Sequence, residues 1–92
     1  MNAFGRFFNA IMNELLTLLA KALAVAEKLE REAYQAWTKR DLEEFPPYDA
    51  DGRYVMHSGE PSDEHRRLNR EYRRVYYCRQ DIGRALHELK QT

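Results

Sequence analysis

The sequence predicts an all-α fold: an antiparallel two-helix hairpin with a long irregular connecting loop. Apolar residues recur at alternating steps of four and three over residues 4–44 and again over 63–90, which is the spacing of helices that pack along one side. The only prolines, Pro46, Pro47 and Pro61, fall between these segments, where they end helices. When one segment folds back on the other, their apolar seams match layer by layer.

The length of 92 residues predicts one domain, over residues 1–92. A chain this short buries only about 60–65% of the surface that its unfolded form exposes, so its core is thin unless subunits share one. Lysine plus arginine equals aspartate plus glutamate at 15 each, so no global charge attracts nucleic acid or an anionic membrane. Cys78 is the one cysteine, which excludes an internal disulfide and favours a cytoplasmic location.

The first helix, over residues 4–44, carries two neighbouring apolar rows. The seam is interrupted once, by Glu32, and the second row once, by Glu30. Two adjacent rows are wider than one partner helix covers, so this helix is expected to have two neighbours. The seam consists of Phe4, Phe8, Ile11, Leu15, Leu18, Ala22, Val25, Leu29, Glu32 and Ala36, and the second row of Met12, Leu16, Leu19, Leu23, Ala26, Glu30, Ala33 and Trp37.

The connection over residues 45–61 is longer than a usual structureless link. Its sequence DADG, which ends at Gly52, favours a turn, and a short β-hairpin over residues 48–56 is the structure we expect there. The second helix, over 63–90, begins after Ser62 as N-cap, with Asp63 and Glu64 in its first turn, where the helix dipole favours negative charge.

A single register, in which facing residue numbers sum to 104, aligns both seams in the hairpin. Leu29 then faces Val75, Val25 faces Arg79, and Glu32 faces a hydroxyl donor on Tyr72. This register leaves the second row and residues 1–12 uncovered, so we expect self-association, with a dimer that forms a four-helix bundle as the simplest assembly, or a protein partner. The predicted interface residues are Phe4, Phe7, Phe8, Ile11, Met12, Leu16, Leu19, Leu23 and Trp37.

The apolar opening, MNAFGRFFNAIM, could be a leader or a membrane anchor. Only Arg6 is positive near the start, and Glu14 and Lys21 interrupt the apolar run, whereas a signal peptide and a transmembrane span both need an unbroken one. We therefore expect neither. Attachment to a membrane surface through the phenylalanines is a further hypothesis, although so few basic residues attract anionic lipid weakly.

The second helix is rich in arginine, with eight basic against five acidic residues from Ser62 onward. One interpretation is that these arginines form ion pairs with Glu27, Glu30, Glu32 and Glu71. Another is that arginine and tyrosine together bind nucleic acid or a nucleotide, and a third is an acidic protein partner. The candidate anion-binding residues are Arg66, Arg67, Arg70, Arg73, Arg74, Tyr77 and Arg84.

No motif in the chain predicts catalysis, a cofactor or a metal. DADG lacks the later ligands of a calcium loop, and His57, His65, His87 and Cys78 are not at the paired spacings of zinc sites. Ser58 beside His57 has no visible third catalytic partner. We expect a non-enzymatic interaction protein that binds a macromolecule stoichiometrically, as small accessory or inhibitory proteins of bacteria and phages do. Nucleic-acid or nucleotide binding is the alternative.

Overall fold

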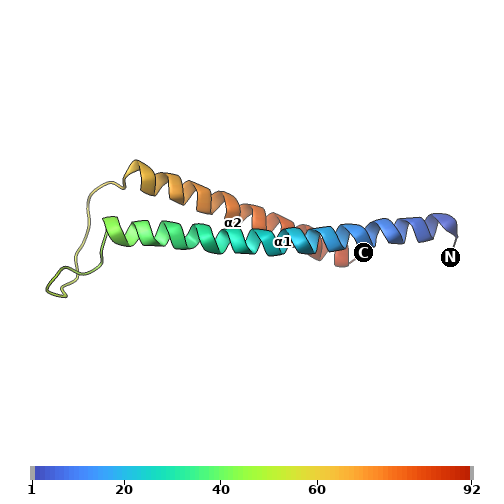
Figure 1. Cartoon of the computed structure of the whole chain (residues 1–92), viewed down its shortest axis with the longest axis horizontal. Helices are drawn as coiled ribbons and strands as arrows, with labels where there is room; N and C mark the ends of the chain where they lie inside the picture. Colours follow the sequence, from blue (N-terminus) through green and yellow to red (C-terminus); the bar gives the residue numbers. More distant parts are fainter. Residues whose placement is uncertain (1, 92) are drawn as a thin grey trace.

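The structure, a computed structural model, describes residues 2–91 and confirms the all-α hairpin. Helix α1 spans Ala3–Glu44 and helix α2 spans Asp63–Lys90, and α2 folds back along α1 (Figure 1). The molecule is a rod with dimensions of 73 × 24 × 16 Å. Because α2 is 28 residues long and α1 is 42, the N-terminal part of α1 extends beyond the end of α2 (Figure 1).

Side chains and prolines set the helix boundaries. The Asn2 side chain caps α1 by accepting a hydrogen bond from the Gly5 N–H at 2.7 Å. At the other end, α1 ends at Glu44 with Phe45 as its C-cap, because Pro46 disfavours helical geometry in the residue before it. Ser62 caps α2, and its hydroxyl accepts from the His65 N–H at 3.1 Å. The predicted bounds differ from the observed ones by one residue, at the start of α1.

The connecting loop contains a tight turn around Gly52, whose φ of 78° is one that glycine adopts without strain. The Asp49 carboxylate closes the turn by accepting from the backbone N–H groups of Asp51 and Arg53, each at 2.9 Å. Tyr48 and Tyr54 form an isolated antiparallel bridge, and among residues 2–91 no strand is present. The expected β-hairpin is thus reduced to a single bridge.

A polar cluster ties the two helix ends together at the loop. The Glu44 carboxylate accepts hydrogen bonds from the Ser62 hydroxyl at 2.6 Å, from the Ser62 N–H at 2.8 Å and from Arg40 Nε at 2.7 Å. These bonds, the Ser62 hydroxyl first, lower the pKa of Glu44 to about 2, since each favours the ionised form. Nearby, Asp41 Oδ1 lies 2.8 Å from Nε2 of the buried His65.

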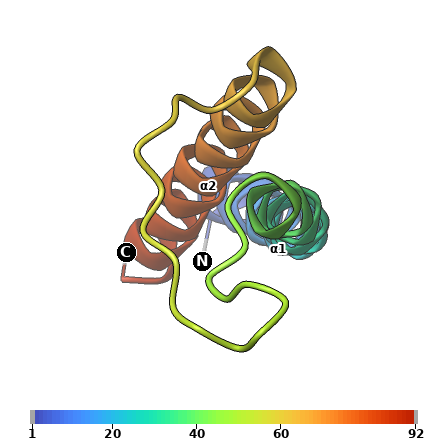
Figure 2. The same ribbon diagram turned by 90° about the vertical axis from the view of Figure 1, so that its left-hand side faces the viewer.

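The predicted register of the hairpin is wrong. Val25 and Leu29, expected to face α2, are 58% and 48% exposed. It is the second row that contacts α2: Glu30 binds Arg79, Trp37 stacks on Tyr72, and Leu23 lies beside Gly83. Figure 2, viewed from the loop end, shows α2 on one side of α1. Facing numbers sum to 109 at the Glu30–Arg79 pair, not to 104.

Two interactions explain why the second row faces α2. Glu30, the one polar residue of that row, receives two hydrogen bonds from Arg79, at 2.6 and 3.2 Å, so opposite charges meet inside the interface and neither is desolvated alone. Trp37 and Tyr72 stack with ring planes 2° apart and centroids 5.8 Å apart. The predicted register would instead place Glu32 against a neutral tyrosine and Arg79 against an aliphatic side chain.

The interior of the hairpin is thin. Among the described residues only Ala26, Leu86 and His65 are buried, so much of the contact between the helices is half-exposed. Aromatic side chains fill the end near the loop, where a chain of ring contacts runs through Tyr34, Trp37, Tyr72, Tyr76 and Tyr77. This cluster joins α1 to α2 near the loop.

Candidate interaction surfaces

A stripe of large apolar side chains along α1 is not covered by α2. Its eight large side chains are between 41% and 75% exposed. Seven of them belong to the predicted seam, whose residues alternate at steps of four and three, and Phe7 lies directly beside it, so all eight lie on one side of the helix. We call this set the apolar stripe: Phe4, Phe7, Phe8, Ile11, Leu15, Leu18, Val25 and Leu29.

The exposed stripe coincides only in part with the predicted interface residues. Phe4, Phe7, Phe8 and Ile11 are exposed as expected. The remaining predicted residues, Met12, Leu16, Leu19, Leu23 and Trp37, are half-buried in the row that faces α2. Leu15, Leu18, Val25 and Leu29 take their place, because the register of the hairpin exchanges the two rows.

The first turns of α1 project beyond α2. The last turn of α2 ends at a shallow hollow between the helices that is lined by Phe8, Asn9, Met12, Leu16, Leu89 and Lys90. The N-terminal turns of α1 before this hollow therefore project beyond α2 (Figure 1). Phe4, at 75% exposed, and Phe7, at 66%, are the most exposed members of the apolar stripe.

Apart from Arg79, which pairs with Glu30, the arginines of α2 divide into two groups. Arg66, Arg67 and Arg84 form exposed ion pairs with carboxylates of the loop or of α2 itself, namely Glu60, Glu64, Glu71 and Asp81. The hydrogen bonds from Arg67 also lower the pKa of Glu64. Arg70, Arg73 and Arg74 form no hydrogen bond or ion pair with residues 2–91, so these three arginines do not form the ion pairs with Glu27, Glu30, Glu32 or Glu71 that one interpretation of the sequence predicted.

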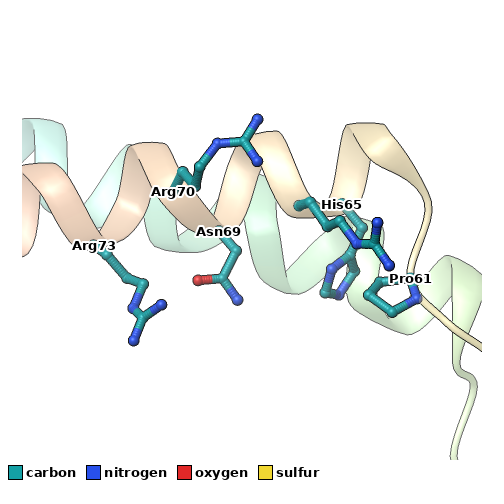
Figure 3. Close-up of a pocket in the computed structure, with 6 residues that line it drawn as sticks. Pro61, His65, Asn69, Arg70 and Arg73 are labelled. Atoms are coloured by element: carbon teal, nitrogen blue, oxygen red, sulfur yellow. The ribbon is translucent and has the colours of Figure 1, made fainter.

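Three of these arginines border one hollow on the outer side of α2. Arg66, Arg70 and Arg73, which we call the arginine ledge, line a cavity of about 250 Å³ together with Pro61, His65 and Asn69 (Figure 3). No carboxylate lines this hollow. Tyr77, placed by the sequence among the anion-binding candidates, is 57% exposed and packs edge-on against Tyr76, outside the hollow.

The histidines and the cysteine do not converge. His57 Nε2 lies 2.6 Å from the Pro46 carbonyl oxygen, and its ring packs against Phe45, so its observed contacts belong to the loop. Cys78 is exposed. Among residues 2–91, no group of three histidine, cysteine, aspartate or glutamate side chains is close enough to hold a metal ion.

Helix α1 also meets the length and composition criteria for a membrane span. An 18-residue stretch of it has a mean hydropathy of 1.4, and no residue of that stretch is buried. Core helices of soluble proteins and N-terminal signal sequences meet the same criteria, so the property does not assign α1 to a membrane. Comparison of the chain with known protein families, with curated proteins and with solved structures finds no match.

Proposed function

We propose that this chain is a non-enzymatic interaction protein that acts by stoichiometric binding to a macromolecule, with the apolar stripe as its main binding surface. The observation that carries the proposal is the exposure of a continuous heptad-spaced row. The stripe has eight large side chains, each exposing on the order of 100 Å², so it offers roughly 800 Å². The largest apolar patch of a typical monomer is only about 300–600 Å², whereas a standard protein interface buries about 800 Å² per partner.

The pattern of the stripe favours a protein helix over a lipid surface as its partner. Apolar residues alternate at steps of three and four, which is the spacing that a partner helix interlocks with. The residues that directly precede Leu15, Ala22 and Leu29 of the seam are Glu14, Lys21 and Lys28. This mixture of charges suits a charged partner helix. A helix that lies on an anionic membrane carries mainly lysine and arginine beside its apolar face.

Substitution of Leu18 by glutamate tests the proposal. Leu18 lies in the middle of the stripe and is 54% exposed, so the variant should keep the fold while it places a carboxylate in the interface. Burying an unpaired charge is costly, and we expect association to weaken at least about a hundredfold. The measurement is molar mass by light scattering over a range of concentrations, with helicity checked by circular dichroism.

Ala24→Glu is the matched control, because Ala24 is exposed and lies outside both apolar rows. It adds the same charge and should leave association unchanged. If Leu18→Glu and Ala24→Glu associate equally, the stripe is not the binding surface. If instead the wild-type chain floats with anionic liposomes and Leu18→Glu does not, the partner is a lipid surface and the protein-binding proposal fails.

The arginine ledge supports a second candidate function, the binding of nucleic-acid phosphates. Arg70 and Arg73 have no partner among the described residues, and guanidinium groups bind phosphate oxygens through paired donors. We expect a fluorescent single-stranded oligonucleotide to bind at low salt with an affinity that falls steeply as salt rises. Arg70→Ala with Arg73→Ala should weaken this binding about tenfold or more.

The control for the ledge removes the same charge elsewhere. Arg67→Ala with Arg84→Ala takes away two arginines that are already paired with carboxylates, so it should change the affinity much less. Absence of oligonucleotide binding at low salt, or an equal loss in both double variants, would exclude the ledge as a phosphate site.

A further inference from the structure

We infer that the helix which covers the apolar stripe is α1 of a second copy of this chain, running antiparallel. The inference rests on the proposed function, because it names the partner of the same surface. In the arrangement that we infer, facing residues of the stripe have numbers that sum to 33, so the twofold axis passes between residues 16 and 17. Three features of the chain lead to this register: its apolar layers, its flanking charges and the point where α2 ends.

The register uses the seam from Phe4 to Leu29 without a polar break. Each layer pairs one residue with an apolar residue of the partner, and every layer occurs twice by symmetry. Glu32, the one charged residue of the seam, lies beyond the last layer. The layers place Phe4 against the partner's Leu29, Phe8 against the partner's Val25, Ile11 against the partner's Ala22, and Leu15 against the partner's Leu18.

The charges beside the seam are complementary in this register. Glu14 precedes Leu15, and Lys21 precedes Ala22, so both occupy the same flanking position of the heptad. In an antiparallel pair these flanking positions face their equivalents, and Glu14 meets the partner's Lys21 on each side of the twofold axis. Both side chains are exposed, and neither forms an ion pair within residues 2–91.

Other arrangements of two α1 helices fit less well. If the register shifts by one heptad, so that facing residue numbers sum to 26, Glu14 lies against the partner's Glu14 and Leu29 has no facing residue in the partner. A shift to a sum of 40 sets Lys21 against the partner's Lys21 and brings Glu32 opposite Phe8. In a parallel pair of α1 helices, Glu14 lies beside Leu19 of the second copy, and no opposite charge faces it.

The length of α2 agrees with the position of the twofold axis. The last turn of α2 lies beside Leu16, in the hollow that Leu89 also lines, and the axis passes between residues 16 and 17. The α2 helices of the two copies then lie on the same side of the α1 pair, and their C-terminal ends face each other near the axis. The N-terminal turns of α1, which project beyond α2 (Figure 1), lie along the part of the partner that carries its α2.

Site-specific cross-linking tests the register. In a Cys78→Ser background, the two single variants Glu14→Cys and Lys21→Cys are treated with a short bis-maleimide, separately and as a mixture. We expect cross-linked dimers only in the mixture, with the linkage between positions 14 and 21 confirmed by mass spectrometry. A dimer of Glu14→Cys alone indicates a sum of 26, and a dimer of Lys21→Cys alone indicates a sum of 40, and either one overturns the inference.

Charge reversal gives an independent test. Glu14→Lys alone should raise the dimer dissociation constant about three- to tenfold, because each exposed pair contributes little but occurs twice. Adding Lys21→Glu should restore the wild-type affinity, whereas adding Lys28→Glu should not. Rescue by Lys28→Glu would show that the sum is 40, and an unchanged affinity in Glu14→Lys would overturn the register.

The two proposals fail separately. If Leu18→Glu abolishes association but the cross-linked and rescued pairs do not appear, the stripe is a binding surface and only the register is wrong. If the wild-type chain is a monomer at every concentration, the second copy is not the partner, and the stripe has to be tested against other helices. If the wild-type chain and Leu18→Glu also bind every other tested helix with the same affinity, the proposed function fails as well.

Discussion

Replacing Trp37 with alanine is expected to lower the free energy of unfolding by about 3 kcal/mol, the usual cost of removing a large aromatic side chain. The reason is the thin interior, in which only three of the described residues are buried. Trp37 compensates by stacking on Tyr72 and by packing at ring distances of 6.1 Å from Tyr34 and 6.2 Å from His65. The measurement is urea unfolding followed by circular dichroism at one protein concentration.

Trp37→Phe is the matched control for this prediction. The indole Nε1 is buried and has no hydrogen-bond partner among the described residues, so phenylalanine keeps a ring on Tyr72 and loses no hydrogen bond. We expect a cost of about 1 kcal/mol or less. An alanine variant as stable as the phenylalanine variant would show that the aromatic cluster does not hold the hairpin together.

Replacing Glu44 with glutamine is expected to destabilise the hairpin at neutral pH, and the loss should disappear in acid. The Ser62 hydroxyl and N–H, followed by Arg40, lower the pKa of Glu44 from 4.5 to about 2. A carboxylate with a lowered pKa stabilises the folded state fully above pH 4.5, and this contribution is lost as the pH falls toward 2. The stability difference between wild type and Glu44→Gln should therefore close over that interval.

Glu43→Gln provides the comparison, because Glu43 is exposed and, among residues 2–91, its carboxylate forms an ion pair with Arg40 alone, at 3.7 Å. It should cost little at neutral pH. The measurement is the melting temperature of the wild type and of both variants at several pH values between about 2 and 7. A gap for Glu44→Gln that stays constant down to pH 2 would mean that the observed hydrogen bonds to Ser62 do not stabilise the fold.

The helices and their ends were predictable because local chemistry sets them. Pro46 ends α1, Ser62 caps α2, and the heptad spacing marks both helices whatever they pack against. The turn at Gly52 was predictable for the same reason. The strands expected beside it did not form, because segments this short are marginal without a sheet to join.

Spacing alone could not predict which face of α1 packs against α2, because both apolar rows of α1 have the same heptad spacing. The deciding signal is electrostatic and lies in the breaks of the rows. Glu30 is the one charged residue in the second row of α1, and Arg79 is the one charged residue in the apolar row of α2. Pairing these two residues would have given the observed register. The ion pairs of α2 depend on side-chain conformations that residue spacing does not define. Arg67 forms ion pairs with Glu64 and Glu71, whereas Arg70 and Arg73 form none with residues 2–91.

The central claim is that the apolar stripe binds a second copy of the chain, and the molar mass in solution tests it most directly. Light scattering on the wild-type chain from micromolar to millimolar concentration should give twice the chain mass of 11.0 kDa, with dissociation only at the dilute end. A mass of 11.0 kDa at every concentration would contradict the claim.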